Sequence, residues 1–179
     1  MSLVSRYHPL LVALHWLMAL MISVSLVVGF LVLAETSNID PGKIAVLRVH
    51  MAVGMAILAL MLLRFVVRMR SRRPPEATTG NAKLDRAAPL THYGFYLVVV
   101  FVTLSGFTTA IVAGLPAIVF GGSGEPLPPD FDVFLPKAAH AFWAWVLLAL
   151  IALHLLAALY HQFVRKDGLL ARMSFGRRE

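Results

Sequence analysis

The stretch Lys137–Val164, KAAHAFWAWVLLALIALHLLAALYHQFV, decides the fold class of this chain. After Lys137 it contains no lysine, arginine, aspartate or glutamate, and its apolar run is broken mainly by His140, His154 and His161. An α-helix needs about 20 predominantly apolar residues to cross a hydrocarbon core of about 30 Å. This stretch is long enough and apolar enough, so it predicts a transmembrane helix.

Three further apolar segments of this kind precede it, at Leu10–Leu33, Ile44–Val67 and Thr91–Ala113. Over the whole chain, 59% of the residues are hydrophobic and 14% are charged, whereas a soluble domain has about 25% charged residues. The excess of apolar residues needs a lipid-facing surface. We therefore predict an all-α fold, a four-helix transmembrane bundle that forms a single domain over residues 1–179.

The distribution of basic residues predicts how the bundle is oriented. The basic residues at or between the second and third segments are Arg64, Arg68, Arg70, Arg72, Arg73, Lys83 and Arg86, and those after the fourth are Arg165, Lys166, Arg172, Arg177 and Arg178. The other two connections contain Lys43, Arg48 and Lys137 beside Glu35, Asp40, Glu125, Asp130 and Asp132. The positive-inside rule then places both termini and the second connection in the cytoplasm. The net charge of +7 is thus a topology signal and not the basic face of a nucleic-acid reader.

The chain contains no cysteine, which excludes iron–sulfur clusters, thiolate metal sites and thioether-linked haem. Any metal cofactor must therefore be held by histidine, methionine or oxygen ligands. Ionisable residues inside a bilayer are costly, so each histidine in a span needs a partner or a function. A single histidine would most simply form a hydrogen bond between helices, but the pattern across four of them indicates ligation.

His140 and His154 are 14 residues apart in the fourth segment. On an α-helix this spacing puts them about 40° apart in direction and about 21 Å apart along the axis. With the predicted topology, His15 lies at the inner level with His154, and His50 lies at the outer level with His140. Each pair would supply two axial imidazoles to a flat macrocycle held between helices, so the sequence predicts two haem b sites.

Three cations fit the propionate groups of such haems. Arg64 follows His50 by 14 residues, which puts it at the inner level on the same helix face. Arg48 and Lys137 lie at the outer level. The alternative for both is that they are ordinary cations that snorkel to the membrane surface at a helix end.

His8 and His161 share the helix faces of His15 and His154, but they lie about 10 Å closer to the headgroups, which favours the deeper pair. We expect them to be interfacial, in contact with propionates or a quinone. We expect His92 to anchor the start of the third segment at the interface. The connection Ser71–Pro89 is expected to be irregular, and the Gly- and Pro-rich Gly114–Pro136 is expected to form a flexible lid on the outer face.

Two axial histidines would leave no open position on iron, so such sites exchange electrons and do not bind a substrate at the metal. Metal-ion transport is the alternative, but hard or borderline ions usually recruit carboxylates. The four segments contain no aspartate or glutamate. Electron transfer between two haems at different depths is therefore the function that the residues themselves favour.

The combined motifs resemble those of the bacterial cytochrome b561 family. They are Leu14-His15-Trp16, His50 followed by Gly54 and Arg64, Lys137 before His140, and Leu153-His154 followed by His161. The resemblance covers nearly the whole chain, is strongest to small stand-alone members, and implies haem ligation by His15, His50, His140 and His154.

The resemblance also implies a location in the bacterial inner membrane and a reaction in which superoxide at the periplasmic face reduces membrane ubiquinone. The alternative within the family is a membrane-anchor subunit that carries electrons from a hydrogenase or dehydrogenase partner to quinone.

Overall fold

The computed structural model describes residues 5–75 and 82–176, and these residues form helices and connections without any strand. The main helices are α1 (Pro9–Val28), α2 (Gly42–Arg70), α3 (Ala82–Val112), α4 (Leu115–Val119) and α5 (Leu135–Leu159). Short π-helical turns extend α1 over Gly29–Leu33 and α5 over Tyr160–Arg165, and a 3-10 turn covers Leu169–Met173.

Four of these helical segments are long and apolar enough to cross a membrane, which confirms the prediction of four spans. The spans are Pro9–Leu33, Gly42–Arg70, Pro89–Val112 and Leu135–Arg165. In the most apolar window of each, between 11% and 22% of the residues are buried inside the protein. The remaining apolar surface faces outward along the bundle, as expected of a protein whose solvent is lipid.

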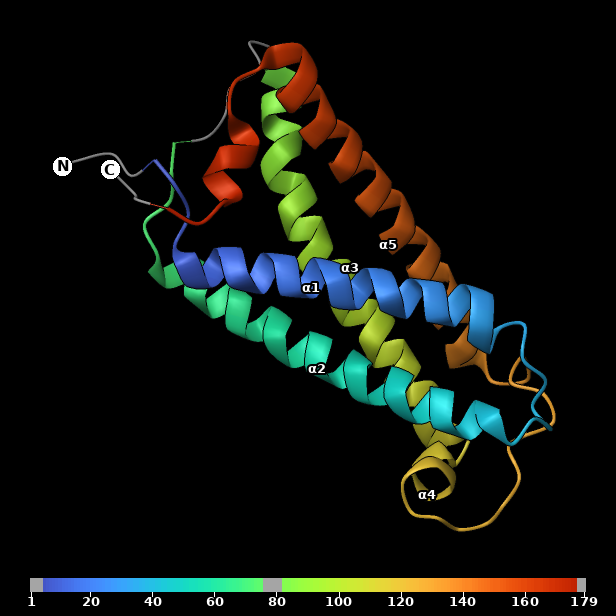
Figure 1. Ribbon diagram of the computed structural model, residues 1–179. Coiled ribbons are helices and arrows are strands. Elements are labelled where there is room, and N and C mark those ends of the chain that lie inside the picture. The colour runs from blue at the N-terminus through green and yellow to red at the C-terminus, as the bar shows by residue number, and fades with distance from the viewer. Residues whose placement is uncertain (1–4, 76–81, 177–179) are drawn as a thin grey trace.

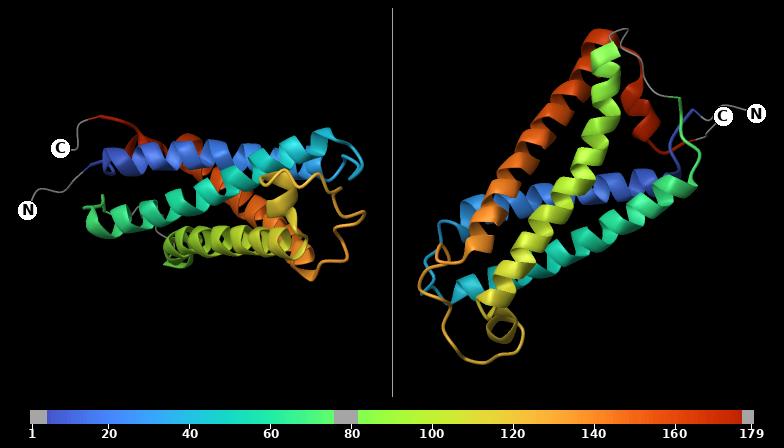
Figure 2. Two further views of the ribbon diagram at one scale, coloured as in Figure 1. Left: turned by 90° about the horizontal axis from the view of Figure 1, so that it is seen from below. Right: turned by 180° about the vertical axis from the view of Figure 1, so that it is seen from behind.

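The bundle consists of two antiparallel pairs that cross each other. Helix α1 runs beside α2, and α3 runs beside α5 (Figures 1 and 2). The start of α1 and the turn Leu169–Met173 lie at one end of the bundle, and α4 lies at the other (Figure 1). We name these the inner and the outer end, after the predicted topology.

The main apolar core lies where the two pairs cross. Its buried members are Met18, Ile22, Ile57, Met61, Val98, Val99, Val102, Ala144 and Leu147. In α1 they follow His15, in α2 they lie between His50 and Arg64, and in α5 they lie between His140 and His154. The core is therefore an apolar layer that separates an inner from an outer histidine level.

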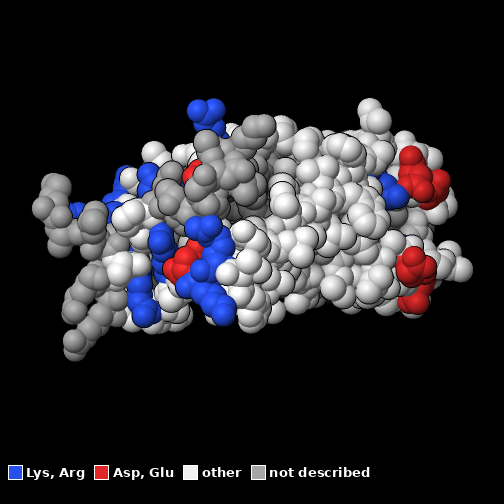
Figure 3. All heavy atoms as spheres, turned by 90° about the horizontal axis from the view of Figure 1, so that it is seen from above, with Lys and Arg blue, Asp and Glu red and all other residues white. Residues whose placement is uncertain are grey.

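Charge is distributed unevenly between the two ends of the bundle. Lysine and arginine side chains gather on the surface near the chain termini, and acidic side chains gather at the opposite end (Figure 3). The same separation of basic and acidic residues underlies the prediction that both termini are cytoplasmic.

Helix α3 begins earlier than the sequence indicated. It starts at Ala82 and continues through Pro89, so the end of the expected irregular connection Ser71–Pro89 is helical. Ala82, Ala87 and Ala88 have high helix propensity, and Asp85 lies in the first turn, where the helix dipole favours a negative charge. These local preferences outweigh the lost hydrogen bond at Pro89.

The outer connection Gly114–Pro136, whose glycines and prolines predict a flexible lid, is partly helical and partly packed against the bundle. It contains α4, and its buried residues join the end of α3 in a second apolar cluster formed by Ala110, Ala113, Leu115, Ile118, Val119 and Leu127. Ile44, Leu47 and Met51 of α2 pack against this cluster. Gly114 makes the tight turn from α3 into α4 at φ 67°, a conformation that favours glycine. The connection therefore covers the outer end of α2.

The C-terminal segment returns across the inner end to the start of α1. Trp16 Nε1 donates a hydrogen bond to the carbonyl of Met173 at 2.9 Å, and the Tyr7 amide donates to the carbonyl of Arg172 at 3.0 Å. Arg172 in turn donates to the carbonyl of Pro75 at 2.6 Å. These bonds join both chain ends and the second connection beside His15.

Candidate functional site: two histidine pairs

The structure brings the four histidines together in the pairs that the sequence predicts. The ring centroids of His15 and His154 are 6.2 Å apart, with 67° between the ring planes. Those of His50 and His140 are also 6.2 Å apart, with 85° between the planes. Each pair joins a helix of the α1–α2 pair to α5, so each pair connects the two halves of the bundle.

The spacing within each pair fits one metal ion held between two imidazoles. A metal–nitrogen bond is about 2 Å long and a ring centroid lies about 1 Å behind the nitrogen, so trans imidazoles have centroids about 6 Å apart. Over residues 5–75 and 82–176, no group of three or more histidines and acids could hold a metal ion. Pairs of imidazoles without carboxylates suit haem iron better than zinc or manganese.

The hydrogen bonds of the outer pair leave ring nitrogens available for a ligand. His140 Nδ1 lies 2.7 Å from the carbonyl oxygen of Val102. Because a carbonyl only accepts, Nδ1 carries the hydrogen and Nε2 keeps its lone pair, the arrangement found where a hydrogen bond to one ring nitrogen orients a metal-binding histidine. His50 Nδ1 is buried and has no hydrogen-bond partner among the described residues. A buried polar atom without a partner marks a place where a ligand completes the structure.

Glycines make room for the outer pair. A Cβ atom on Gly106 of α3 would lie 2.8 Å from His140 Nδ1, closer than side chains pack, so only glycine fits beside this ring. Gly29 lies against the opposite ring, with its ideal Cβ position 3.7 Å from His50 Cε1. A Cβ on Gly54, one turn after His50, would meet no atom within 4 Å. This open space next to the ring suits a flat group between the helices.

Arg64 lies at the inner level, as its spacing from His50 predicts. It is 14 residues after His50 in α2, which is about 21 Å along the helix axis. Its Nη1 donates a hydrogen bond to the Tyr96 hydroxyl at 3.0 Å, and its buried Nε has no partner within the described part of the chain. A cation with a buried, unused donor at the level of the inner histidines fits a haem propionate.

The cations at the outer level already form hydrogen bonds or ion pairs within the protein. Arg48 Nε donates to the carbonyl of Val119 at 2.7 Å, at the end of α4, and Lys137 forms an ion pair with Asp132. The sequence did not single out Lys43, which is buried and donates to the carbonyl of Thr36 at 2.5 Å and to Asn38 Oδ1 at 2.7 Å. The contacts that the structure gives to Arg48 and Lys137 are structural, and their role toward a propionate stays a prediction.

The other histidines have different surroundings. His8 Nδ1 accepts a hydrogen bond from the Leu10 amide at 3.2 Å and so caps α1. His161 Nδ1 contacts Asp167 Oδ2 at 2.6 Å near the inner end. Both lie outside the pairs.

His92 lies near the start of the membrane span Pro89–Val112, where the sequence places it, although α3 itself begins earlier, at Ala82. Its ring centroid is also 6.1 Å from that of His154. Sequence reasoning missed this contact because it depends on how α3 packs against α5. The inner level therefore contains three neighbouring imidazoles, and centroid spacing alone does not separate His15 from His92 as the partner of His154.

A multi-pass helical bundle with paired histidines at two depths defines the class of membrane cytochromes. Residues 6–176 match the family described as prokaryotic cytochrome b561. The chain belongs to this family, whose members bind b-type haem and transfer electrons in membranes.

Several relatives match the chain over nearly its full length. "Probable superoxide oxidase CybB" of Yersinia pestis is 29% identical over 178 residues, which cover 94% of this chain and 95% of the relative. "Cytochrome b561 homolog 2" of Escherichia coli K12 is 26% identical over 171 residues, 94% of this chain and 90% of the relative. "Cytochrome b562" of Cereibacter sphaeroides is 30% identical, over 93% of this chain and 94% of the relative.

Proposed function

We propose that this chain is a di-haem cytochrome that passes electrons from superoxide at the outer end of the bundle to ubiquinone in the bacterial inner membrane. The observation that carries the proposal is the equal 6.2 Å spacing of two histidine pairs at opposite ends of one apolar core. When bound, the haems supply one-electron chemistry at two depths of the membrane.

In this account the protein supplies binding, orientation and insulation. His50 and His140 hold the outer group, and His15 and His154 hold the inner one. The Val102 carbonyl fixes the His140 ring, and the layer around Val99 and Leu147 keeps water from the space between the two levels. With two imidazoles to hold each haem, the iron would exchange electrons without binding a substrate.

Superoxide as the donor is supported by the relative named probable superoxide oxidase, which aligns with 94% of this chain. The test is stopped-flow mixing of the purified protein with superoxide, followed by ubiquinone, without any second protein. We expect haem reduction in the first step and reoxidation in the second. If superoxide does not reduce the protein but quinol does, the superoxide assignment fails and the quinone-linked cytochrome remains.

The charge of the outer end favours a second candidate, a membrane-anchor cytochrome that receives electrons from a partner protein. Acids outnumber cations in the outer connections, and Lys43, Arg48 and Lys137 are each bonded to the protein. Such a surface complements a donor with a basic face better than it attracts a small anion. Co-purification with a peripheral redox subunit would support this candidate.

A further inference from the structure

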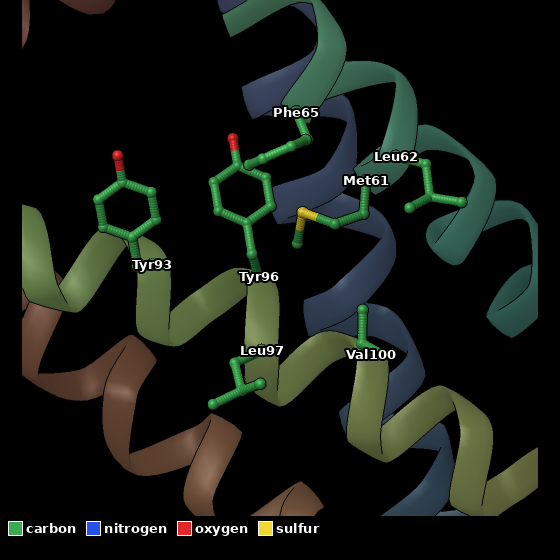
Figure 4. A pocket seen from close by; sticks show the side chains of 7 residues that line it. All are labelled: Met61, Leu62, Phe65, Tyr93, Tyr96, Leu97 and Val100. Carbon is green, nitrogen blue, oxygen red and sulfur yellow. The ribbon is translucent and has the colours of Figure 1, made fainter. Parts of the chain in front are cut away.

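An apolar groove of about 340 Å³ opens between α2 and α3 on the lipid-facing side of the bundle. Met61 and Phe65 line it from α2, and Tyr93, Tyr96 and Leu97 line it from α3 (Figure 4). Phe65, Tyr93 and Leu97 are between 40% and 56% exposed, and all belong to membrane spans. A molecule dissolved in the bilayer therefore reaches this groove sideways, without passing through water.

The groove is connected to the inner histidine level by one hydrogen bond. The Tyr96 hydroxyl accepts from Arg64 Nη1 at 3.0 Å, and the guanidinium carbon lies 6.0 Å from the centre of the Tyr96 ring. Tyr96 also follows His92 by about one turn of α3, and the His92 ring centroid lies 6.1 Å from that of His154. Tyr96 thus connects the wall of the groove with the inner histidine level.

The polar atoms of the groove indicate what it binds. Because Arg64 donates to the Tyr96 oxygen, the hydroxyl hydrogen of Tyr96 remains available for an acceptor. The hydroxyls of Tyr93 and Tyr96 point to the same side, and the Phe65 ring lies beside Tyr96 with 5.3 Å between the ring centroids (Figure 4). A lipid acyl chain would use none of these donors. A flat ring with acceptor oxygens and a long apolar tail would use both the donors and the aromatic walls.

We propose that this groove binds the head group of an isoprenoid quinone, with the Tyr96 hydroxyl donating to one quinone carbonyl oxygen. The inference rests on the proposed function, which supplies the electrons. Reduction of a quinone to a quinol takes up two electrons and two protons. Two molecules of a one-electron donor supply the electrons, and water at the inner end supplies the protons. The charge of Arg64, passed on through its bond to Tyr96, strengthens the hydrogen bond that the phenol donates.

The test uses the haem-loaded protein in lipid nanodiscs, reduced chemically and mixed rapidly with ubiquinone-1. We expect Leu97→Trp, which fills the groove, to raise the half-saturating quinone concentration about tenfold, the scale on which apolar pockets discriminate by size. Tyr96→Phe keeps the shape of the wall and removes the donor, so it should raise that concentration about fivefold. The matched control is Leu104→Trp, on the same face of α3 about 10 Å away from Leu97. This control should behave as wild type, and an azido-quinone should photolabel α2 and α3.

Three outcomes decide the inference. A higher half-saturating quinone concentration in both groove variants, with unchanged haem spectra and unchanged chemical reduction, supports it. If ubiquinone-1 reoxidises wild type and both groove variants equally well, and the photolabel falls outside α2 and α3, the groove does not bind quinone while the proposed function stands. If ubiquinone-1 does not reoxidise wild type at all, the quinone step of the proposed function fails and the groove assignment fails with it.

Discussion

His140 Nδ1 lies 2.7 Å from the carbonyl oxygen of Val102, a bond that joins α5 to α3 at the outer level. It fixes both the tautomer and the direction of the imidazole, so Nε2 keeps its lone pair and would be the atom that binds iron. Through this bond α3 determines how one of the two proposed outer ligands is oriented. The close approach of the two helices depends on Gly106, which lies directly against the His140 ring.

Replacing Gly106 with alanine should displace that ring. The new Cβ would lie 2.8 Å from His140 Nδ1, so the imidazole must move and the Val102 hydrogen bond is lost. We expect loss of the outer haem with retention of the inner one, so that haem content falls to about half. Gly94→Ala is the control on the same helix, since its Cβ would make an ordinary 3.9 Å contact with Leu150. An unchanged haem spectrum in Gly106→Ala would show that the ring is not held there.

Alanine substitutions test which histidines hold the inner haem. His15→Ala and His154→Ala should each lose one haem and keep the other, because their rings face each other at 6.2 Å. His8→Ala and His161→Ala should keep both haems, since His8 caps α1 and His161 contacts Asp167. Haem content and low-temperature spectra measure the result. If His161→Ala loses a haem while His154→Ala keeps both, the assignment of the inner ligands is wrong.

The role of His92 requires a separate variant. Its ring is as close to His154 as the ring of His15 is. If His15 is the ligand, His92→Ala should retain both haems and shift only the potential of the inner one. A haem lost in His92→Ala but kept in His15→Ala would move the ligand from α1 to α3. Redox titration followed by absorption spectroscopy separates the two outcomes.

The sequence predicted the four spans and the histidine pairing because both follow from strong constraints. Runs of apolar residues must match the thickness of the bilayer, and the 14-residue spacing of His140 and His154 fixes two depths on one helix. Such arguments use distances along a helix axis. They required no knowledge of how neighbouring helices rotate against each other.

The details that the sequence missed depend on packing between helices. The contact of Gly106 with His140 and the approach of His92 to His154 are set by how α3 packs against α5. The apolar cluster around α4 was hidden because Gly and Pro residues dominate the connection, whereas Leu115 and Ile118 join a cluster that also takes residues from α2, from α3 and from later in the connection. The ion pair of Lys137 with Asp132 likewise depends on how that connection folds.

Charge substitutions at the outer end test superoxide as the donor. Reduction by superoxide should approach about 10⁸ M⁻¹s⁻¹ and should slow as ionic strength rises, if local cations focus the anion. Lys137→Gln, alone or with Arg48→Gln, should slow the reaction, because in either variant the charge of Asp132 is left unbalanced. Asp132→Asn changes the same ion pair in the opposite direction and should accelerate it. Slow reduction that responds to neither charge nor salt would favour the membrane-anchor cytochrome.

The stability of the C-terminal segment should depend on pH through the carboxyl group of Asp167. Burial alone would raise the pKa of Asp167, but its hydrogen bonds with His161 and the Leu169 amide, together with the charge of Arg165, lower the pKa below its ordinary value. A carboxyl with a lowered folded-state pKa stabilises the fold at neutral pH, and this contribution is lost as pH falls through the folded pKa.

Comparison of thermal unfolding in wild type and Asp167→Asn measures that contribution. The wild-type protein should have the higher Tm at pH 7, and the difference should shrink as pH falls below the ordinary aspartate value of about 4 and vanish below the folded-state pKa. Glu125→Gln, in an exposed part of the outer connection, is the control and should show no such difference. A Tm difference that persists in acid would mean that the carboxylate is not its source.

The haem content of the purified protein shows whether each histidine pair holds one haem. A pyridine haemochrome assay, combined with quantitative protein analysis, should give about two b haems per chain, and the oxidised spectrum should be low-spin as expected for two axial imidazoles. A content of one haem per chain, or a high-spin spectrum, would contradict two bis-histidine sites at the two levels of the bundle.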